Sequence, residues 1–233
     1  MNKAVSVVAA MLLSIVSMAQ TINVHKTNGD VIRIPLSEMH YIDFSEDNTM
    51  IAPPAGVEIV DLGLPSGTKW ANMNVGASNP EDFGYFYAWG ETEEKGMYNK
   101  GTYIDNVNRS KDADLTFTEY DVAHLYWGGL WHMATIEQWR ELEANCNMKW
   151  IQINDVSGYK FISKINNKSI FLPAAGCKKN VSHVYSGAIG YYWSSDLRRI
   201  SYGISFSKEH LWLGSIDWGD EFQVYGCSVR PVQ

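Results

Sequence analysis

The alternation of apolar and polar residues predicts short β-strands along most of the chain. Residues 22–24 and 31–34 alternate on either side of Asn28 and Gly29. This is the pattern of a β-hairpin, because both turn residues tolerate a positive φ. Further strands are predicted at residues 57–62, 69–75, 85–90, 158–164, 169–172, 191–194, 202–206, 221–224 and 228–232.

The clearest helix is predicted to begin after Thr135. Thr135 and Gln138 match a capping box, in which the threonine side chain accepts from the third helical amide and the glutamine reaches back to the cap. A second helix is predicted at residues 119–125, and residues 91–110 lack periodicity and are predicted to form a long surface loop. One face of the main helix would carry Ile136, Trp139, Leu142 and Cys146.

The first nineteen residues have the pattern of a secretory signal peptide. Lys3 precedes an uncharged apolar run over residues 4–16, and small residues at positions 17 and 19 match a cleavage site. We therefore expect an exported protein that is secreted, periplasmic or associated with the cell surface. No later stretch is long and apolar enough to span a membrane. After the signal peptide, we expect a small β segment at 20–44, a linker at 45–56 and one domain at 57–233.

Composition narrows the classes of partner. The formal net charge is −7, which argues against binding to nucleic acid or to an anionic membrane. Hydrophobic residues make up 45% of the chain and charged residues 19%, as in globular proteins. The oligomeric state and the ligand, a glycan or a protein, stay open at this point.

Three cysteines lie in the mature part of the chain. An exported protein can form a disulfide, but an odd number leaves at least one thiol unpaired. No C-x-x-C pair is present, so zinc-ribbon and thioredoxin chemistry have no motif here. The alternative is that all three are small buried hydrophobic residues.

Several sequence blocks follow one another in a recognisable order, at residues 60–70, 74–77, 87–92, 127–129, 171–176, 192–195 and 228–232. Together they resemble the Fibrobacter-type major paralogous domain family. The resemblance covers about residues 57–233 and implies an exported bacterial protein with no established biochemical role. It also implies a distant relation to the C-type-lectin-like fold shared with formylglycine-generating enzymes. The expected fold is therefore α+β, with short twisted antiparallel strands and about two helices, preceded by a small hairpin.

The chain departs from the related fold at one pattern. Relatives of that fold carry Trp-Arg-x-Pro-Thr before the main helix, whereas this chain has His132 and Ala134 in place of the arginine and the proline. Histidine lacks the planar fork of donors that arginine offers, so a site built on that arginine is not expected. In lectin-like folds the main helix and the closing strand are often joined by a disulfide. The resemblance thus implies a Cys146–Cys227 pair, with Cys177 free.

Aromatic residues are the main candidates for ligand binding. They could stack on sugars, because aromatic rings combine a large apolar face with a polar edge; the alternative is an aromatic core between small sheets. The ligand-binding residues we predict are Trp212 and Trp218, with Asp217 and Asp220 beside them. The acidic pair could hold calcium, although a solvated loop is the alternative because no D-x-D-x-D-G spacing is present. The full set of candidate aromatics is Tyr85, Tyr87, Trp89, Tyr191, Tyr192, Trp193, Trp212 and Trp218.

Signals for catalysis are weak. His124 and His132 lack further ligands at metal-binding spacing, and there is no H-E-x-x-H, G-x-S-x-G or phosphate-binding glycine motif. Asp61, Asp82 and Glu91 could be posed as general acid and base, but the sequence gives no distances between them. We therefore expect a non-catalytic binding module for glycan or host-surface material, with no required cofactor. An enzyme of the formylglycine-generating type and a structural surface subunit are the alternatives.

Overall fold

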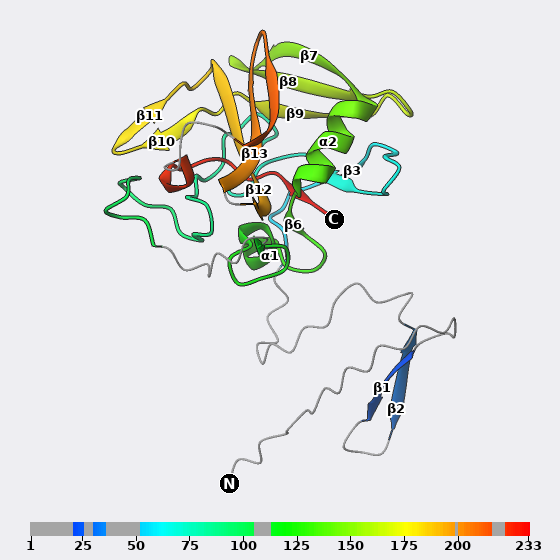
Figure 1. Ribbon diagram of the computed structural model, residues 1–233. Helices are drawn as coiled ribbons and strands as arrows, with labels where there is room; N and C mark the ends of the chain where they lie inside the picture. Colours follow the sequence, from blue (N-terminus) through cyan, green and yellow to red (C-terminus); the bar gives the residue numbers. More distant parts are fainter. Residues whose placement is uncertain (1–20, 26–29, 36–51, 105–112, 199, 216–221) are drawn as a thin grey trace. The chain divides into compact units, whose positions relative to one another are not determined.

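The structure is a computed structural model, and it describes residues 21–25, 30–35, 52–104, 113–198, 200–215 and 222–233 (Figure 1). The chain divides into two compact units, Met1–Asn48 and Thr49–Gln233. The division falls within residues 45–56, most of which lie outside the described residues, so the linker stays a prediction. None of the described helices is long and apolar enough to cross a bilayer.

The smaller unit contains the predicted hairpin. Strands β1 (Thr21–His25) and β2 (Val31–Pro35) pair antiparallel, with Thr21 opposite Pro35 and His25 opposite Val31. Val31 and Ile32 are largely exposed. The apolar run at residues 41–44 lies outside the described residues.

The larger unit is built from small antiparallel sheets (Figure 1). One has the order β3-β4-β15-β6, formed by Ile59–Asp61, Lys69–Ala71, Pro231–Val232 and His132–Met133. A second has the order β14-β13-β12-β5, formed by Leu211–Ser215, Ile200–Ser207, Ile189–Arg198 and Ala113–Asp114. A third comprises β7 (Cys146–Ile153), β8 (Val156–Ser163) and β9 (Ser169–Pro173). The hairpin β10 (Cys177–Lys179) and β11 (Ser182–Val184) completes the set.

Two α-helices are present among the described residues. Helix α2 (Ile136–Asn145) begins after Thr135, and both bonds of the capping box are formed: Thr135 Oγ1 accepts from the Gln138 amide at 3.2 Å, and Gln138 Oε1 accepts from the Thr135 amide at 2.8 Å. Its apolar face is buried, as predicted. Helix α1 (Val122–Trp127) is shorter and is capped by the buried carboxylate of Asp121.

The expected α+β, C-type-lectin-like fold is wrong. Strands account for 41% of the chain and helices for 11%, and the strands are spread over several small sheets, which makes the protein mostly β. Two strand assignments are also wrong. Residues 85–90 contribute only a single bridge, from Tyr87 to Cys227. Of the predicted strand at residues 221–224, the structure describes residues 222–224, and these form a turn of 3-10 helix.

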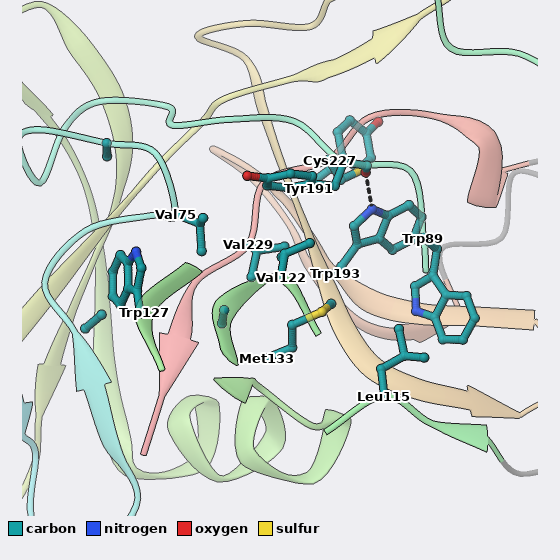
Figure 2. Packing of buried hydrophobic residues seen from close by; sticks show 14 of the residues in the cluster. Val75, Trp89, Leu115, Val122, Trp127, Met133, Tyr191, Trp193, Cys227 and Val229 are labelled. Atoms are coloured by element: carbon teal, nitrogen blue, oxygen red, sulfur yellow. Dashed lines mark hydrogen bonds between the residues drawn. The ribbon is translucent and has the colours of Figure 1, made fainter. Parts of the chain in front are cut away.

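Two groups of buried residues fill the larger unit. The first core lies around Trp89, Trp193 and Cys227 (Figure 2). The second core lies around Trp70 and Trp139, between α2 and the strands β8, β9 and β13. The second core combines aromatic and aliphatic side chains, and the Trp70 and Trp139 rings lie 4.5 Å apart between centroids.

A buried arginine lies between the two cores. Arg230 is fully buried and donates to Asn74 Oδ1 at 2.8 Å, to the Ala71 carbonyl at 3.0 Å and to the Phe171 carbonyl at 2.9 Å. Ala71 belongs to the first core, and Tyr192, which also contacts the guanidinium, belongs to the second. Burial lowers the pKa of Arg230 to about 10, so the side chain stays charged at neutral pH.

Candidate functional site

The structure sorts the candidate aromatic residues into interior and surface. Five of them are at most 1% exposed and belong to the two cores: Tyr87, Trp89, Tyr191, Tyr192 and Trp193. Figure 2 shows Trp89, Tyr191 and Trp193 in the first core. Tyr85 is 47% exposed and Trp212 is 52% exposed. Trp218 lies outside the described residues. A single platform made of all eight rings is therefore wrong.

The ligand site predicted around Trp212 is only partly described. Trp212 lies on β14, and its ring centroid is 5.2 Å from that of His210. Asp217, Trp218 and Asp220 lie outside the described residues, so their roles stay predictions. Within the described part of the chain, no group of three or more His, Cys, Asp or Glu side chains could hold a metal ion.

The two candidate histidines have structural surroundings. His132 Nδ1 lies 2.9 Å from the Leu130 carbonyl, and Nε2 lies 3.4 Å from the Gln138 amide nitrogen. Burial lowers the pKa of His132. The Phe117 ring packs against both His124 and His132, at 5.2 and 4.8 Å between centroids. His124 lies on α1 and His132 on β6, so these contacts fit side chains that pack the helix against the strand.

The predicted Cys146–Cys227 pair takes one cysteine from each core. All three cysteines are buried, and Cys146 belongs to the second core whereas Cys227 belongs to the first. The Cys146–Cys227 disulfide stays a prediction. Burial raises the pKa of Cys146 to about 11 and that of Cys177 to about 12. It also raises the pKa of Cys227 well above its ordinary value. Thiols with such values are poor nucleophiles at neutral pH.

A group of tyrosines forms the best-defined candidate site. We call Tyr85, Tyr87 and Tyr126 the tyrosine face. The Tyr87 ring contacts the other two, with its centroid 6.5 Å from that of Tyr85 and 6.2 Å from that of Tyr126. Tyr85 and Tyr126 are exposed, whereas Tyr87 is 1% exposed. The Tyr87 hydroxyl has no hydrogen-bond partner within the part of the chain that the structure describes.

Local geometry fixes the two exposed rings. A Cβ placed on Gly76 would come within 2.4 Å of the Tyr85 ring carbons, so the ring lies directly on the glycine backbone. The Tyr85 amide donates to the Val75 carbonyl at 2.9 Å. On the other side, the Tyr126 hydroxyl donates to the Thr92 carbonyl at 2.9 Å. Both rings are therefore held in place before any ligand arrives.

Acidic side chains give the tyrosine face a negative potential. Burial raises the pKa of Tyr126 and of Tyr87, and the nearby carboxylates of Glu93 and Glu94 raise both further. One oxygen of Glu94 accepts from the Phe86 amide at 3.0 Å, which ties this carboxylate to the strand-like segment beneath the face. The site thus offers carboxylate acceptors beside phenolic donors.

The described part of the predicted 91–110 loop is held by a buried ion pair. Glu91 is 7% exposed, and its Oε1 accepts from Lys95 Nζ and from the Ile104 amide, both at 2.7 Å. Lys95 also donates to the Thr102 carbonyl at 3.0 Å. Tyr103 donates to the Trp89 carbonyl at 2.8 Å. These bonds make residues 91–104 a built scaffold for Glu93 and Glu94.

Glu91 is therefore engaged as a structural anion. The other two carboxylates posed as acid and base accept from turns of their own: Asp61 accepts from the Gly63 amide at 2.8 Å, and Asp82 accepts from the Asn79 amide at 2.8 Å. These contacts describe turn-forming residues and give no support to an acid–base pair.

A shallow pocket of about 350 Å³ adjoins the tyrosine face. It lies between the 91–104 loop and the β10–β11 hairpin, which are joined by mutual backbone hydrogen bonds of Tyr98 and Asn180 at 2.9 and 2.8 Å. Glu94 lines the pocket, and its carboxylate also acts on Tyr87 and Tyr126 of the tyrosine face. The pocket lining consists of Glu94, Lys95, Gly96, Tyr98, Lys178, Asn180 and Val181.

Comparisons with known proteins give one match. Residues 129–232 match a family described as Domain of unknown function (DUF8237). No curated protein and no solved structure matches the chain. The matched segment contains Cys177, Trp212 and Cys227 but neither Tyr85 nor Tyr126. The resemblance to the Fibrobacter-type family stays a prediction.

Sequence reasoning missed Tyr126 and the special position of Tyr87. Tyr126 comes one residue after the predicted helix at 119–125, and nothing local distinguishes it from a core aromatic. The sequence does not separate Tyr87 from the other aromatics, because its burial depends on packing against residues far away in the chain.

Proposed function

We propose that this chain is an exported, non-catalytic carbohydrate-binding protein that holds neutral glycans on the tyrosine face. The observation that carries the proposal is the pair of fixed, exposed rings of Tyr85 and Tyr126, which both contact the buried ring of Tyr87. Export rests on the signal-peptide pattern of residues 1–19.

The geometry suits a sugar for two reasons. The apolar faces of pyranose rings stack on aromatic rings, and a few polar groups then fix their orientation. The rings of Tyr85 and Tyr126 are already held by Gly76 and by the Thr92 carbonyl, so little side-chain freedom is lost on binding. The buried Tyr87 ring contacts both exposed rings and supports their positions.

The charges favour neutral over acidic sugars. Glu93 and Glu94 act on the phenols of the face, and carboxylates accept hydrogen bonds from sugar hydroxyls. A uronate or a sialic acid would bring a second negative charge to the same surface and would be repelled. The negative net charge of the chain acts in the same direction.

The alternatives are less well supported. A thiol-based oxidase needs a reactive cysteine, and burial raises the pKa of Cys177 to about 12, which disfavours the thiolate. A purely structural subunit would leave a fixed tyrosine face next to acidic side chains without a role.

The binding test uses the whole chain on an array of neutral and acidic glycans, followed by titration calorimetry with the best neutral ligand. We expect binding to neutral chains that a chelator leaves unchanged. Tyr85→Ala and Tyr126→Ala should each weaken binding by about ten-fold or more, equal to about 1.4 kcal/mol or more. Trp212→Ala serves as the exposed aromatic control and should bind like the parent.

Tyr87→Phe is the control for the buried ring beside the two exposed tyrosines. Because the Tyr87 hydroxyl has no described partner, its removal should leave the free energy of unfolding unchanged or slightly higher. Because the hydroxyl is also buried, glycan binding should stay close to that of the parent. Unchanged binding in Tyr85→Ala and Tyr126→Ala would contradict the proposal, and loss of binding in Trp212→Ala alone would move the site to β14.

Export has its own measurement. N-terminal sequencing of the protein released from a bacterial host should begin near Gln20. Retention of Met1 on released protein would contradict this part of the proposal and leave the binding experiment unaffected.

A further inference from the structure

The register between β10 and the segment that ends in β15 brings two cysteines together. Lys178 and Gly226 form an antiparallel bridge, and each amide donates to the other's carbonyl, at 2.8 and 2.9 Å. In an antiparallel pair, the residues next to such a doubly bonded pair are Cys177 on one strand and Cys227 on the other.

Cys177 and Cys227 share no backbone hydrogen bonds with each other, and this kind of antiparallel pair has the shorter Cα separation. Cys227 exchanges its backbone bonds with Tyr87 on the far side of its segment, at 2.9 and 3.0 Å, and Cys177 pairs with Val184 on the far side of β10. Antiparallel pairs that do not hydrogen-bond to each other have Cα atoms about 4.5 Å apart. Disulfides span Cα separations of about 4.4–6.8 Å, so this arrangement suits one.

The side chains share one environment. Cys177 and Cys227 are 2% and 0% exposed, and both belong to the first core (Figure 2 shows Cys227 beside Tyr191). The Cys177 thiol is close enough to raise the pKa of Cys227 beyond the effect of burial. Cys146 belongs to the second core and has no part in this contact.

We propose that Cys177 and Cys227 form a disulfide when the chain folds under oxidising conditions, which leaves Cys146 as the single free thiol. The oxidant is a disulfide, either of a low-molecular-weight thiol or of a dithiol oxidase. Two exchange steps break the two S–H bonds and the S–S bond of the oxidant and form the Cys177–Cys227 bond. The oxidant leaves as two thiols, which carry the two protons and the two electrons.

Burial determines when this bond forms. The attacking species in exchange is the thiolate, and both buried thiols have raised pKa values in the folded chain. The exchange is therefore fast while the chain is still folding and slow once the first core has closed. The bond would tie β10, which carries the pocket residue Lys178, to the backbone partner of Tyr87. This inference does not depend on the proposed glycan ligand.

The test is refolding of the full chain in a buffer of oxidised and reduced glutathione, followed by alkylation in denaturant and peptide mapping without reduction. We expect a linked peptide pair containing Cys177 and Cys227, a mass loss of about two hydrogens, and one alkylated thiol at Cys146. Reduced, folded protein given the same buffer should form the link far more slowly. The oxidised chain should also unfold at a higher denaturant concentration than the reduced chain.

Variants distinguish this pair from the alternative pair. Cys146→Ser should still lose two hydrogens under oxidising refolding, whereas Cys177→Ser should keep both remaining thiols. The parent map decides the question even if a serine variant fails to fold. Three alkylated thiols after oxidising refolding, or a link that involves Cys146, would overturn the proposal.

Discussion

The two cores of the larger unit are held together in different ways. Around the second core, backbone pairing is continuous: β7 and β8 pair without interruption from Cys146 opposite Ser163 to Ile153 opposite Val156. Around the first core, several contacts are single bridges between distant segments, such as Tyr87 with Cys227 and Lys178 with Gly226. The candidate site and the cysteine pair both lie on this irregular side. Regular pairing thus supplies a frame, and irregular pairing brings chemically useful side chains together.

The largest effect is expected at the residue that joins the two cores. Arg230→Met would leave Asn74 Oδ1 and two buried carbonyls without their donor. Each buried acceptor left unsatisfied costs about 1–3 kcal/mol, so the expected loss is about 3 kcal/mol or more. Because Arg230 lies between the cores, both should unfold in one transition. Denaturant unfolding followed by tryptophan fluorescence measures this. Arg140→Met, at an exposed helix position, should change stability by less than about 0.5 kcal/mol. Equal effects of the two variants would contradict the role given to Arg230.

The next test concerns the second core alone. Trp139 is 1% exposed beneath α2, so Trp139→Ala should lower the free energy of unfolding by about 3–5 kcal/mol. Its indole nitrogen has no described partner, so Trp139→Phe keeps most of the packing and should cost less than about 1.5 kcal/mol. Chemical denaturation gives both values. If each core stabilises its own side of the molecule independently, the folded Trp139→Phe variant should bind glycan like the parent. Similar losses in both variants would contradict the assignment of this stabilisation to packing of the aromatic ring.

The smallest effect concerns pH and the first core. Asp121 caps α1, and burial raises its pKa from 3.8 to about 6 although backbone amides donate to it. The folded chain therefore binds a proton more tightly than the unfolded chain, and stability from this group falls as pH rises from about 4 to about 6. A shift of this size corresponds to about 3 kcal/mol at most.

Asp121→Asn removes that titration. The destabilisation caused by this substitution should consequently be larger at about pH 4.5 than at about pH 7, by about 2 kcal/mol. His132 acts in the opposite direction: burial lowers its pKa, so its contribution to stability is lost as pH falls below about 6.5. Since His132 is present in both chains, it cancels in the difference. Urea titrations of the parent and of Asp121→Asn at the two pH values measure the difference in destabilisation. A difference that does not change with pH would mean that Asp121 stays ionised throughout.

Local signals explain what the sequence predicted correctly. The capping box of Thr135 and Gln138 needs only four neighbouring residues, and both of its hydrogen bonds are formed. The paired strands β8 and β9 lie close together in the sequence, and the hairpin of β1 and β2 does too. Periodicity and turn residues are sufficient for such elements.

Distant contacts explain what the sequence could not provide. Residues 85–90 alternate like a strand, but their bridge partner Cys227 lies about 140 positions away, and only one residue pairs. The lectin-like prediction depended on ordered blocks and carried no information about how many small sheets the strands would form. Of the predicted ligand residues, only Trp212 lies in the described chain, and Tyr126 gave no local signal.

Gly76 carries a consequence for how this surface can vary. Its φ is +78°, and the Tyr85 ring occupies the space that any side chain would need. Positions 76 and 85 are therefore genetically coupled: an aromatic residue at 85 in this orientation is compatible only with glycine at 76. In a mutational library selected for ligand capture, the two positions should show strong epistasis, with substitutions at 76 removing the benefit of tyrosine at 85. A glycine that offers no side chain to a ligand thus limits which binding surfaces this scaffold can evolve.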